Sequence, residues 1–423
     1  MRNPNDASLK SWVEVPKGSD FPIQNLPFGI FSTNRRNKRA GIAIGNRIVD
    51  LSELSRRGYL GISGIGNDVF EMDTLNAFLK LGRKKCGDVR RKVSELLDSE
   101  NSSLRNKEND VKEVLIEMAD AQMHMPVDVR NYTDFYSSKE HATNIGTMFR
   151  DPQNALLPNW KHLPVAYHGR ASSIIISGQD IRRPKGQTKS PEDPRPVYGP
   201  TQRLDFELEM AFITCKSNSL GDQIKLAETE DYIFGFCLFN DWSARDIQAW
   251  EYVPLGPFLA KNFASSISPW IVTLDALEPF RIEGPAQEEK VLPYLAFEGS
   301  KNFDINLEVF IKPDKSEEVS VCKSNFRHMY WNVNQQLTHH TVNGCNVQVG
   351  DIYASGTISG PTPDSYGSML EIAWNGTKPV KMKDGSERRF INDGDEVILR
   401  GYCKKNGIRI GFGEVRNRVL PAK

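Results

Sequence analysis

The chain has 423 residues, with 54 lysines and arginines against 54 aspartates and glutamates, 39% apolar residues and 6 cysteines. A chain of this length is typical of two or three domains. Because the net charge is zero, no global field attracts nucleic acid or an anionic membrane surface, and we expect neither as a partner. The cysteines are scattered without a Cys-x-x-Cys motif, which is typical of reduced thiols. No run has the length of a signal-peptide core or a membrane span, so we expect a cytoplasmic protein.

The N-terminal part of the chain predicts a small domain of strands and helices. Residues 28–51 contain the apolar runs FGIFS and GIAIG around a charged segment, which predicts short β-strands with a polar turn. Two helices are expected next. One covers residues 74–97 with a break near Gly87, and the other begins at Asp110 and ends at Pro126.

The character of the sequence changes near residue 125, where strands, glycine and proline begin to dominate. We therefore divide the chain into a domain of residues 1–125 and a larger β-rich domain of residues 126–423. Residues 180–202 contain five prolines, too many for a helix or a central strand, so we expect an irregular surface loop there. Strand-like runs of the second domain cover residues 206–213, 232–240, 270–274, 305–311, 347–353, 369–374 and 396–402.

Two glutamates stand out in the run LDFELEMAFI, where Glu207 and Glu209 alternate with apolar residues. Residues i and i+2 of a strand share a face, so the two carboxylates would project side by side. Like charges this close repel unless a cation or a proton lies between them, and a hard divalent cation resolves that conflict. A solvated strand face is the alternative explanation of the same alternation.

A further acid follows the apolar strand in YIFGFCLFNDWSARDIQAWEY. If a helix begins at Asp241, then Arg245 and Gln248 lie four and seven residues later on the same helical face. An acid, a guanidinium and an amide would then converge at the end of a strand. The alternative is that Asp241 only caps the helix and forms an ion pair with Arg245.

The segment DVRNYTDFYSSKEHATNIGTMFR contains Asp134, Tyr136, His141 and Arg150. A carboxylate, a phenol, an imidazole and a guanidinium together suit the binding of an anionic substrate and the transfer of a proton. The alternative is a structural role for His141, which is the more common role of a single histidine. Tyr167 lies in a donor-rich loop downstream, where packing is the alternative explanation.

Glu371 lies in the apolar run MLEIAW, after a loop of small residues at 356–360. A carboxylate in an apolar strand needs a partner, and His141 could be that partner. Such a contact would fix the imidazole tautomer and raise the basicity of the other ring nitrogen.

These segments, together with LPNWKHLPVAYHGRASS and SGTISG, resemble the fumarylacetoacetate hydrolase family over nearly the whole chain. The resemblance implies a mainly β (α+β) fold, in which a small N-terminal SH3-like barrel precedes a larger mixed β-roll that holds the active site. It also implies a homodimer that hydrolyses a carbon–carbon bond of the diketo acid 4-fumarylacetoacetate. The products would be fumarate and acetoacetate, in the last step of tyrosine and phenylalanine catabolism.

The same resemblance implies two cation sites. The positions that match the family's calcium ligands are Asp134, Glu207, Glu209 and Asp241. The positions associated with magnesium are Asp241, Lys261 and Ser265. A lysine is physically odd as a direct ligand, so we interpret Lys261 as lying beside the site and binding an anionic oxygen. Ser265 stands where the family usually has threonine, a change that keeps the hydroxyl.

Catalytic and substrate-binding roles also follow from the resemblance. His141 matches the proton acceptor, and Glu371 would orient it. The groups expected to stabilise an oxyanion are Arg245, Gln248 and Lys261. The positions that match substrate contacts are Tyr136, Arg150, Gln248, Tyr252 and Thr357, and we add Tyr167 because of the donor-rich loop in which it lies.

Two other functions compete with this interpretation. One is a different member of the superfamily, such as an acylpyruvate hydrolase or an oxaloacetate decarboxylase, and the long N-terminal domain and the YTDFYSS segment argue against it. The other is a non-catalytic β protein that is stabilised by a metal and binds a ligand. The presence of His141, Glu371 and Lys261 argues against that reading.

Overall fold

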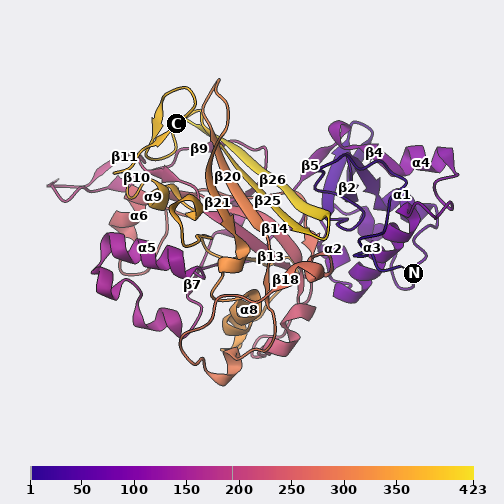
Figure 1. The fold of residues 1–423 in the computed structure, drawn as a ribbon, viewed down its shortest axis with the longest axis horizontal. Coiled ribbons are helices and arrows are strands. Elements are labelled where there is room, and N and C mark those ends of the chain that lie inside the picture. Colours follow the sequence, from indigo (N-terminus) through magenta and orange to yellow (C-terminus); the bar gives the residue numbers. More distant parts are fainter. Residues whose placement is uncertain (1, 193) are drawn as a thin grey trace.

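The computed structural model describes residues 2–192 and 194–423 of the chain. A smaller N-terminal part, coloured indigo and purple in Figure 1, lies beside one end of a larger part that is dominated by long strands. The two parts are in direct contact, because Phe28 and Ile271 form a β-bridge between them. The expectation of a β-rich protein with a separate N-terminal part is therefore confirmed.

The N-terminal part contains an antiparallel five-stranded sheet in the order β4-β3-β2-β1-β5. Its strands are β1 (Phe28–Thr33), β2 (Arg36–Ile44), β3 (Arg47–Asp50), β4 (Leu115–Glu117) and β5 (Gln122–His124). Its helices are α1 (Leu51–Arg56), α2 (Asn76–Leu79), α3 (Arg83–Leu97) and α4 (Glu108–Val114). Strands β1 to β3 confirm the strands expected between residues 28 and 51.

Both helix predictions for this part were wrong in detail. Helix α3 runs without interruption through Gly87, and the break lies earlier, at Gly82, whose φ of 86° a helix does not accommodate. The second helix ends at Val114 instead of Pro126. Its backbone turns into strand β4 because Leu115 pairs with Val49 of β3, and this strand pairing overrides the helical pattern of the sequence.

The larger part is built around an eight-stranded mixed sheet in the order β7-β6-β22-β13-β14-β16-β8, with β17 paired to β14. Most pairs are antiparallel, whereas β6 with β22 and β8 with β16 are parallel. The strands are β6 (Tyr132–Phe135), β7 (Ala166–His168), β8 (Ile174–Ile176), β13 (Leu208–Thr214), β14 (Ile233–Asp241), β16 (Ser265–Ile267), β17 (Val272–Thr273) and β22 (Ile352–Ala354).

A second sheet of five strands, in the order β21-β20-β25-β26-β9, packs against the first. Its strands are β9 (Ile181–Arg182), β20 (Asn306–Lys312), β21 (Val319–Asn325), β25 (Glu396–Lys405) and β26 (Ile408–Leu420). The main core lies between the two sheets, where Phe236 and Leu238 of β14 belong to one buried cluster with Leu307, Val309 and Leu399. Burial of this apolar surface makes the sheet that carries the site rigid.

The remaining elements lie around these two sheets. The helices are α5 (Lys139–Phe149), α6 (Arg245–Glu251), α7 (Leu274–Leu277), α8 (Val333–Thr341) and α9 (Met369–Ile372). The two-stranded ribbons are β10 (Lys185–Thr188) with β11 (Val197–Pro200), β12 (Leu204–Asp205) with β15 (Ser243–Ala244), β18 (Arg281–Ile282) with β19 (Asn302–Phe303), and β23 (Val380–Lys381) with β24 (Glu387–Arg388).

Two expectations for this part were wrong. Residues 180–202 are not wholly irregular, since β10 and β11 form a hairpin in which Pro200 occupies the last position of its strand. Residues 369–374 form no strand, because Met369–Ile372 is helix α9. Ser368 caps this helix, and two buried carboxylate oxygens of Asp205 accept its first backbone N–H groups, which favours a helix over a strand.

Within the described ranges, no helix combines the length and the apolar character that crossing a membrane requires. The cysteines in the same ranges are all free thiols, and all except Cys345 are buried.

Candidate active site

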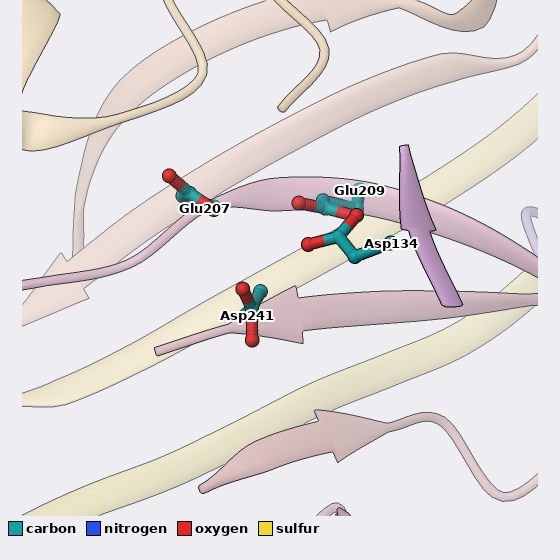
Figure 2. A group of neighbouring side chains, drawn as sticks. All are labelled: Asp134, Glu207, Glu209 and Asp241. Atoms are coloured by element: carbon teal, nitrogen blue, oxygen red, sulfur yellow. The ribbon is translucent and has the colours of Figure 1, made fainter. Parts of the chain in front are cut away.

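Four buried carboxylates converge on one face of the eight-stranded sheet (Figure 2). Asp134 lies on β6, Glu207 directly before β13, Glu209 on β13, and Asp241 at the end of β14. One carboxylate oxygen from each residue lies within 4.8 Å of those of the other three. The structure thus brings together the four acids that the resemblance implied as cation ligands.

Strand pairing explains how acids so far apart in the sequence meet. Strands β13 and β14 are antiparallel, with Leu208 opposite Asn240, so Glu207 and Asp241 lie at the same end of the pair. The N–H of Asp241 donates to the carbonyl of Glu207 at 3.3 Å. On the other side, β22 lies between β13 and β6, and its small residue Ala354 is paired with Asp134.

Two of the four acids are poorly satisfied by the protein itself. Among the residues that the structure describes, Asp134 Oδ1 and Glu209 Oε1 have no hydrogen-bond partner. Burial raises the pKa of both carboxyls well above the usual range, and the neighbouring carboxylates raise it further. Buried oxygens of this kind cost free energy unless a proton or a cation binds them. An all-oxygen set with unsatisfied acceptors suits a hard divalent cation, so these residues fit a cation site.

The other two acids are neutralised by cationic side chains. Lys261 Nζ contacts Glu207 and lies 2.6 Å from Asp241 Oδ2. Arg245 Nη2 lies 2.8 Å from Glu207 Oε1. Burial raises the pKa of Glu207, but Lys261 and Arg245 outweigh that effect and lower it to about 2. The lysine pKa is itself raised, because the attraction of Asp241 and Glu207 exceeds the cost of burial.

A protonated lysine has no lone pair, so Lys261 lies beside the cation site and is not a ligand. Ser265 Oγ donates to Asp241 Oδ1 at 2.8 Å, which places this hydroxyl at the edge of the cluster.

His141 and Glu371 form a buried pair next to the acidic cluster. His141 Nδ1 lies 2.7 Å from Glu371 Oε2. The same carboxylate accepts hydrogen bonds from Ser359, Ser368 and Asn144 at 2.9, 2.8 and 2.9 Å. Burial acts to raise the pKa of Glu371, but His141 and these donors outweigh it and lower the pKa. An ionised Glu371 holds the proton on Nδ1 and leaves Nε2 as the basic nitrogen of His141.

Local structure positions the imidazole. Ser138 caps helix α5, and its Oγ accepts the N–H of His141 at 3.2 Å, so His141 lies in the first turn of the helix. The ring of Tyr136 packs edge-on against the imidazole with a centroid distance of 5.1 Å. These contacts restrict the ring to one orientation.

Three of the expected substrate residues, Gln248, Thr357 and Tyr167, are buried or contact the charged groups of the site. Gln248 Oε1 accepts a hydrogen bond from Arg245 Nη1 at 3.2 Å. Thr357 is buried, and its hydroxyl has no hydrogen-bond partner among the described residues. Tyr167 donates to Asp241 Oδ2 at 2.8 Å, so this phenol lies against the acidic cluster.

Arg150 and Tyr252 are more peripheral than the sequence suggested. Arg150 is exposed, and its guanidinium donates to the carbonyl of Ala155 at 2.6 Å. Tyr252 follows the last turn of α6 and is 52% exposed.

Both sequence interpretations of the Asp241 segment were wrong. Asp241 is the last residue of β14, and helix α6 begins only at Arg245, so Asp241 shares no helical face with Arg245 and Gln248. The alternative also fails, because α6 is preceded by Ala244 and Arg245 pairs with Asp205 and Glu207. The short strand β15, which pairs with β12, separates the acid from the helix.

Sequence reasoning missed the groups that hold Arg245 and Glu371 in place. Asp205 is fully buried and accepts hydrogen bonds from Arg245 Nε at 2.8 Å and from two N–H groups of α9. The sequence contained a pattern that indicates Asp205, because this residue continues the alternation of Glu207 and Glu209 in the run DFELE. The role of Ser368 could also have been predicted, because Ser368 and Glu371 form the pattern Ser-x-x-Glu, which is typical of a helix N-terminus. No local pattern indicates Asn144 or Ser359.

The fold and the site define a β-rich protein whose buried all-oxygen cluster lies beside an oriented imidazole. Comparison with known families narrows that class. The family model described as "Fumarylacetoacetate (FAA) hydrolase C-terminal" matches residues 130–420, and the model "Fumarylacetoacetase N-terminal" matches residues 24–126. The chain belongs to the fumarylacetoacetate hydrolase family.

Known proteins of this family are similar to the chain over nearly their full length. The chain is 51% identical to fumarylacetoacetase of Homo sapiens, with 97% of this chain and 99% of that protein covered. It is 52% identical to fumarylacetoacetase of Caenorhabditis elegans, with 98% and 100% covered. The solved fumarylacetoacetate hydrolase of Exiguobacterium antarcticum matches with a TM-score of 0.52 at 18% identity, covering 94% of this chain and 100% of that one. The structural match supports the shared fold.

Proposed function

We propose that the protein hydrolyses 4-fumarylacetoacetate to fumarate and acetoacetate, in a cation-dependent reaction at this site. The observation that carries the proposal is the His141–Glu371 pair, which lies next to an acidic cluster with unsatisfied oxygens. The near-complete similarity to proteins named fumarylacetoacetase supports the choice of substrate.

His141 begins the proposed reaction by accepting a proton from water at Nε2. Glu371 stabilises the imidazolium that forms, since it holds Nδ1–H at 2.7 Å. The hydroxide attacks the ketone carbon next to the bond to be broken, and the carbonyl becomes a tetrahedral oxyanion. When the oxyanion collapses, the carbon–carbon bond breaks and the imidazolium returns a proton to the carbanion of acetoacetate.

Stabilisation of the oxyanion falls to Arg245, Gln248 and Lys261. One well-placed donor contributes about 2.7–4 kcal/mol in comparable sites. Arg245 and Gln248 are already hydrogen-bonded to each other, so their positions are set before substrate binds. We assign the binding of substrate oxygens to Tyr136, Arg150, Tyr167, Gln248, Tyr252 and Thr357.

The residues that would hold a calcium ion are Asp134, Glu207, Glu209 and Asp241. Asp241 would also serve a magnesium ion, with Ser265 and Lys261 nearby. A bound cation of this type supplies Lewis acidity that disperses negative charge on the substrate. The buried carboxylate oxygens without a partner in the described ranges support this assignment.

We further propose a homodimer. The segment that follows α6 exposes several large apolar side chains, among them Leu255 at 97% and Phe258 at 66%. Tyr198 of strand β11 is 75% exposed, and this strand belongs to the hairpin that contacts α6. Large exposed apolar side chains on neighbouring elements are typical of an interface between subunits.

We propose that the N-terminal sheet forms an SH3-like barrel within residues 1–125 and that residues 126–423 form the catalytic β-roll. The antiparallel order of the N-terminal sheet supports the first assignment. Free cysteines throughout the described residues support a cytoplasmic location.

The proposed function is tested by following the ultraviolet absorbance of the diketo acid with purified protein, before and after treatment with a chelator. We expect loss of absorbance with release of fumarate and acetoacetate, abolished by the chelator and restored by Ca²⁺ or Mg²⁺. An acylpyruvate and oxaloacetate serve as matched controls. Turnover of either control with none of the proposed substrate would contradict the assignment, and binding without turnover would indicate a non-catalytic protein.

A further inference from the structure

Asp205 is a fully buried carboxylate that lies between two parts of the candidate site. It is the last residue of strand β12, two residues before Glu207. Its two oxygens accept three hydrogen bonds, one from Arg245 Nε at 2.8 Å and two from the backbone N–H groups of Met369 and Leu370 at 2.7 and 3.0 Å. One side chain therefore contacts both the arginine of helix α6 and the first turn of helix α9.

The first of these contacts fixes the guanidinium of Arg245. Asp205 accepts from Nε at 2.8 Å, Glu207 lies 2.8 Å from Nη2, and Gln248 accepts from Nη1 at 3.2 Å. Each nitrogen of the guanidinium has a defined partner, and the arginine is only 8% exposed. Because an arginine side chain has many rotamers, partners on three sides are needed to hold its donors in one direction. Without Asp205, the guanidinium would turn toward Glu207, the acid that remains.

The second contact fixes the start of helix α9, which carries Glu371. This helix has only four residues, so its own hydrogen bonds restrain it weakly. Ser368 caps it, and Asp205 accepts the N–H groups of its first two residues. Glu371 is the third residue of the helix, and its Oε2 lies 2.7 Å from His141 Nδ1. A shift of the helix would therefore disturb the contact between Glu371 and the imidazole.

We propose that Asp205 is a positioning residue that holds the oxyanion donor Arg245 in register with the helix that carries Glu371. The inference rests on the roles proposed above for Arg245, Glu371 and His141. In that reaction the arginine and the imidazole act on the same carbonyl group of the substrate, so their relative position matters. A misplacement of about 1 Å can lower a rate by roughly 100-fold.

The test is Asp205→Asn, which keeps the size of the side chain but cannot accept all three donors. In either orientation of the amide, its NH₂ group faces at least one of these N–H groups, and two donors repel each other. We expect kcat for 4-fumarylacetoacetate to fall by about 100-fold. The KM should stay near the wild-type value, because the affected groups act in the transition state. A variant with the wild-type kcat would overturn the inference.

Asp395→Asn is the matched control for the loss of a buried ion pair. Asp395 is 1% exposed and accepts hydrogen bonds from Arg388 at 2.7 and 2.8 Å and from the N–H of Asn392 at 2.9 Å. These partners lie outside the candidate site. Both variants should unfold at a lower urea concentration than the wild type, but only Asp205→Asn should lower kcat. Equal losses of kcat in the two variants would indicate a purely structural role and contradict the proposal.

A double variant tests whether Asp205 acts through Arg245. Asp205→Asn/Arg245→Gln leaves no unpaired buried charge at this ion pair, so it should fold even if Asp205→Asn alone does not. We expect it to be slower than Arg245→Gln, because α9 is still displaced, but by less than about 100-fold, because one of the two routes is already lost. A double variant as fast as Arg245→Gln would contradict the role of α9. A further loss of the full 100-fold or so would show that Asp205 acts independently of Arg245.

Amide hydrogen exchange tests the contact with α9 without substrate or cation. In chelator-treated Asp205→Asn, or in the double variant, the amides of residues 368–372 should exchange faster than in the wild type. Asp395→Asn should leave this exchange unchanged. Wild-type exchange in the Asp205 variants would overturn the inference. Because this measurement does not depend on turnover, it distinguishes a failure of the inference from a failure of the proposed function, which would appear as a wild type that does not hydrolyse the diketo acid.

Discussion

Glu371 and Glu209 are both fully buried glutamates of the same site, yet their hydrogen bonding and the directions of their pKa shifts are opposite. Glu371 accepts hydrogen bonds from His141 and three further side chains, and its pKa is lowered. Glu209 accepts one backbone N–H, from Gly356 at 3.0 Å, and its pKa is raised. The protein itself stabilises the first carboxylate in its ionised form, whereas one oxygen of the second is left for a proton or a cation. One site therefore contains a satisfied carboxylate beside an unsatisfied one.

Removal of the base should have the largest effect on turnover. We expect His141→Ala to lower kcat by about 10²–10⁴-fold, because general-base catalysis contributes that much. Calcium affinity should stay at the wild-type value, since His141 is not part of the acidic cluster. Turnover and bound metal are measured on the same sample. Retained turnover with retained metal would disprove the base assignment, and the exposed His162→Ala is the control.

The contrast between the two glutamates is tested by the pair Glu209→Gln and Glu371→Gln. We expect Glu209→Gln to weaken cation affinity by more than the roughly 100-fold that the loss of an outer hydrogen-bond partner causes. Turnover should be lost together with the cation. Glu371→Gln should lose turnover but keep its affinity for Ca²⁺. Calorimetric titration and the absorbance assay measure the two effects. If both variants lost the cation equally, the division of the site into two regions would be wrong.

Cation binding should strengthen as pH rises. In the cation-free protein the pKa values of Asp134 and Glu209 lie well above 3.8 and 4.5, their ordinary values. Between those ordinary values and the raised ones, the folded state holds more protons than the unfolded state. The unfolding free energy therefore falls as pH rises through this window, by at most about 1.4 kcal/mol per pH unit for each group.

Calcium displaces the same protons, so its binding should release protons to the buffer. Titrations in buffers of different ionisation enthalpy measure that release. For Glu371 the sign is reversed, because its pKa is lowered and its contribution to stability is lost as pH falls through the folded-state pKa. Calcium affinity that does not change between about pH 5 and pH 8 would contradict the raised pKa values.

The smallest effect is expected for Ser359→Ala. This change removes one of the donors to Glu371 and the acceptor for the N–H of Gly367. Hydrogen bonds to charged groups contribute about 1.5–3 kcal/mol, so we expect a loss of unfolding free energy in that range. Because His141 and two other donors remain, kcat should fall by less than tenfold, and Ca²⁺ affinity should not change. Urea unfolding and steady-state kinetics provide the measurements, with Ser172→Ala as a control at an exposed serine.

Much of the site was visible in local patterns. The alternation around Glu207 and Glu209 indicated paired carboxylates on a strand, and the strand before Asp241 was expected within one residue of its observed bounds. The partnership of Glu371 with His141 was suggested by the need to satisfy a carboxylate in an apolar run, and the contact is present. These inferences succeed because alternation and burial are properties of a few adjacent residues.

Other features had no local signal. The residues of helix α9 were predicted as part of a strand, because a short apolar-rich run fits either structure. Only the contacts of Asp205 and Ser368 favour the helix. Helix α4 stops at Val114 because the edge of β3 is available to pair with Leu115. In both places a partner far away in the sequence overrides the local preference.

The sequence by itself determined the family, the β-rich character and the identity of the acids, since residue type and spacing carry that information. Only the tertiary structure decided how those acids differ. Lys261 and Arg245 contact Glu207, whereas one oxygen of Asp134 and one of Glu209 have no donor in the described part of the chain. Whether a buried charge is satisfied depends on atoms that strand pairing brings together across the chain, and no local pattern contains that information.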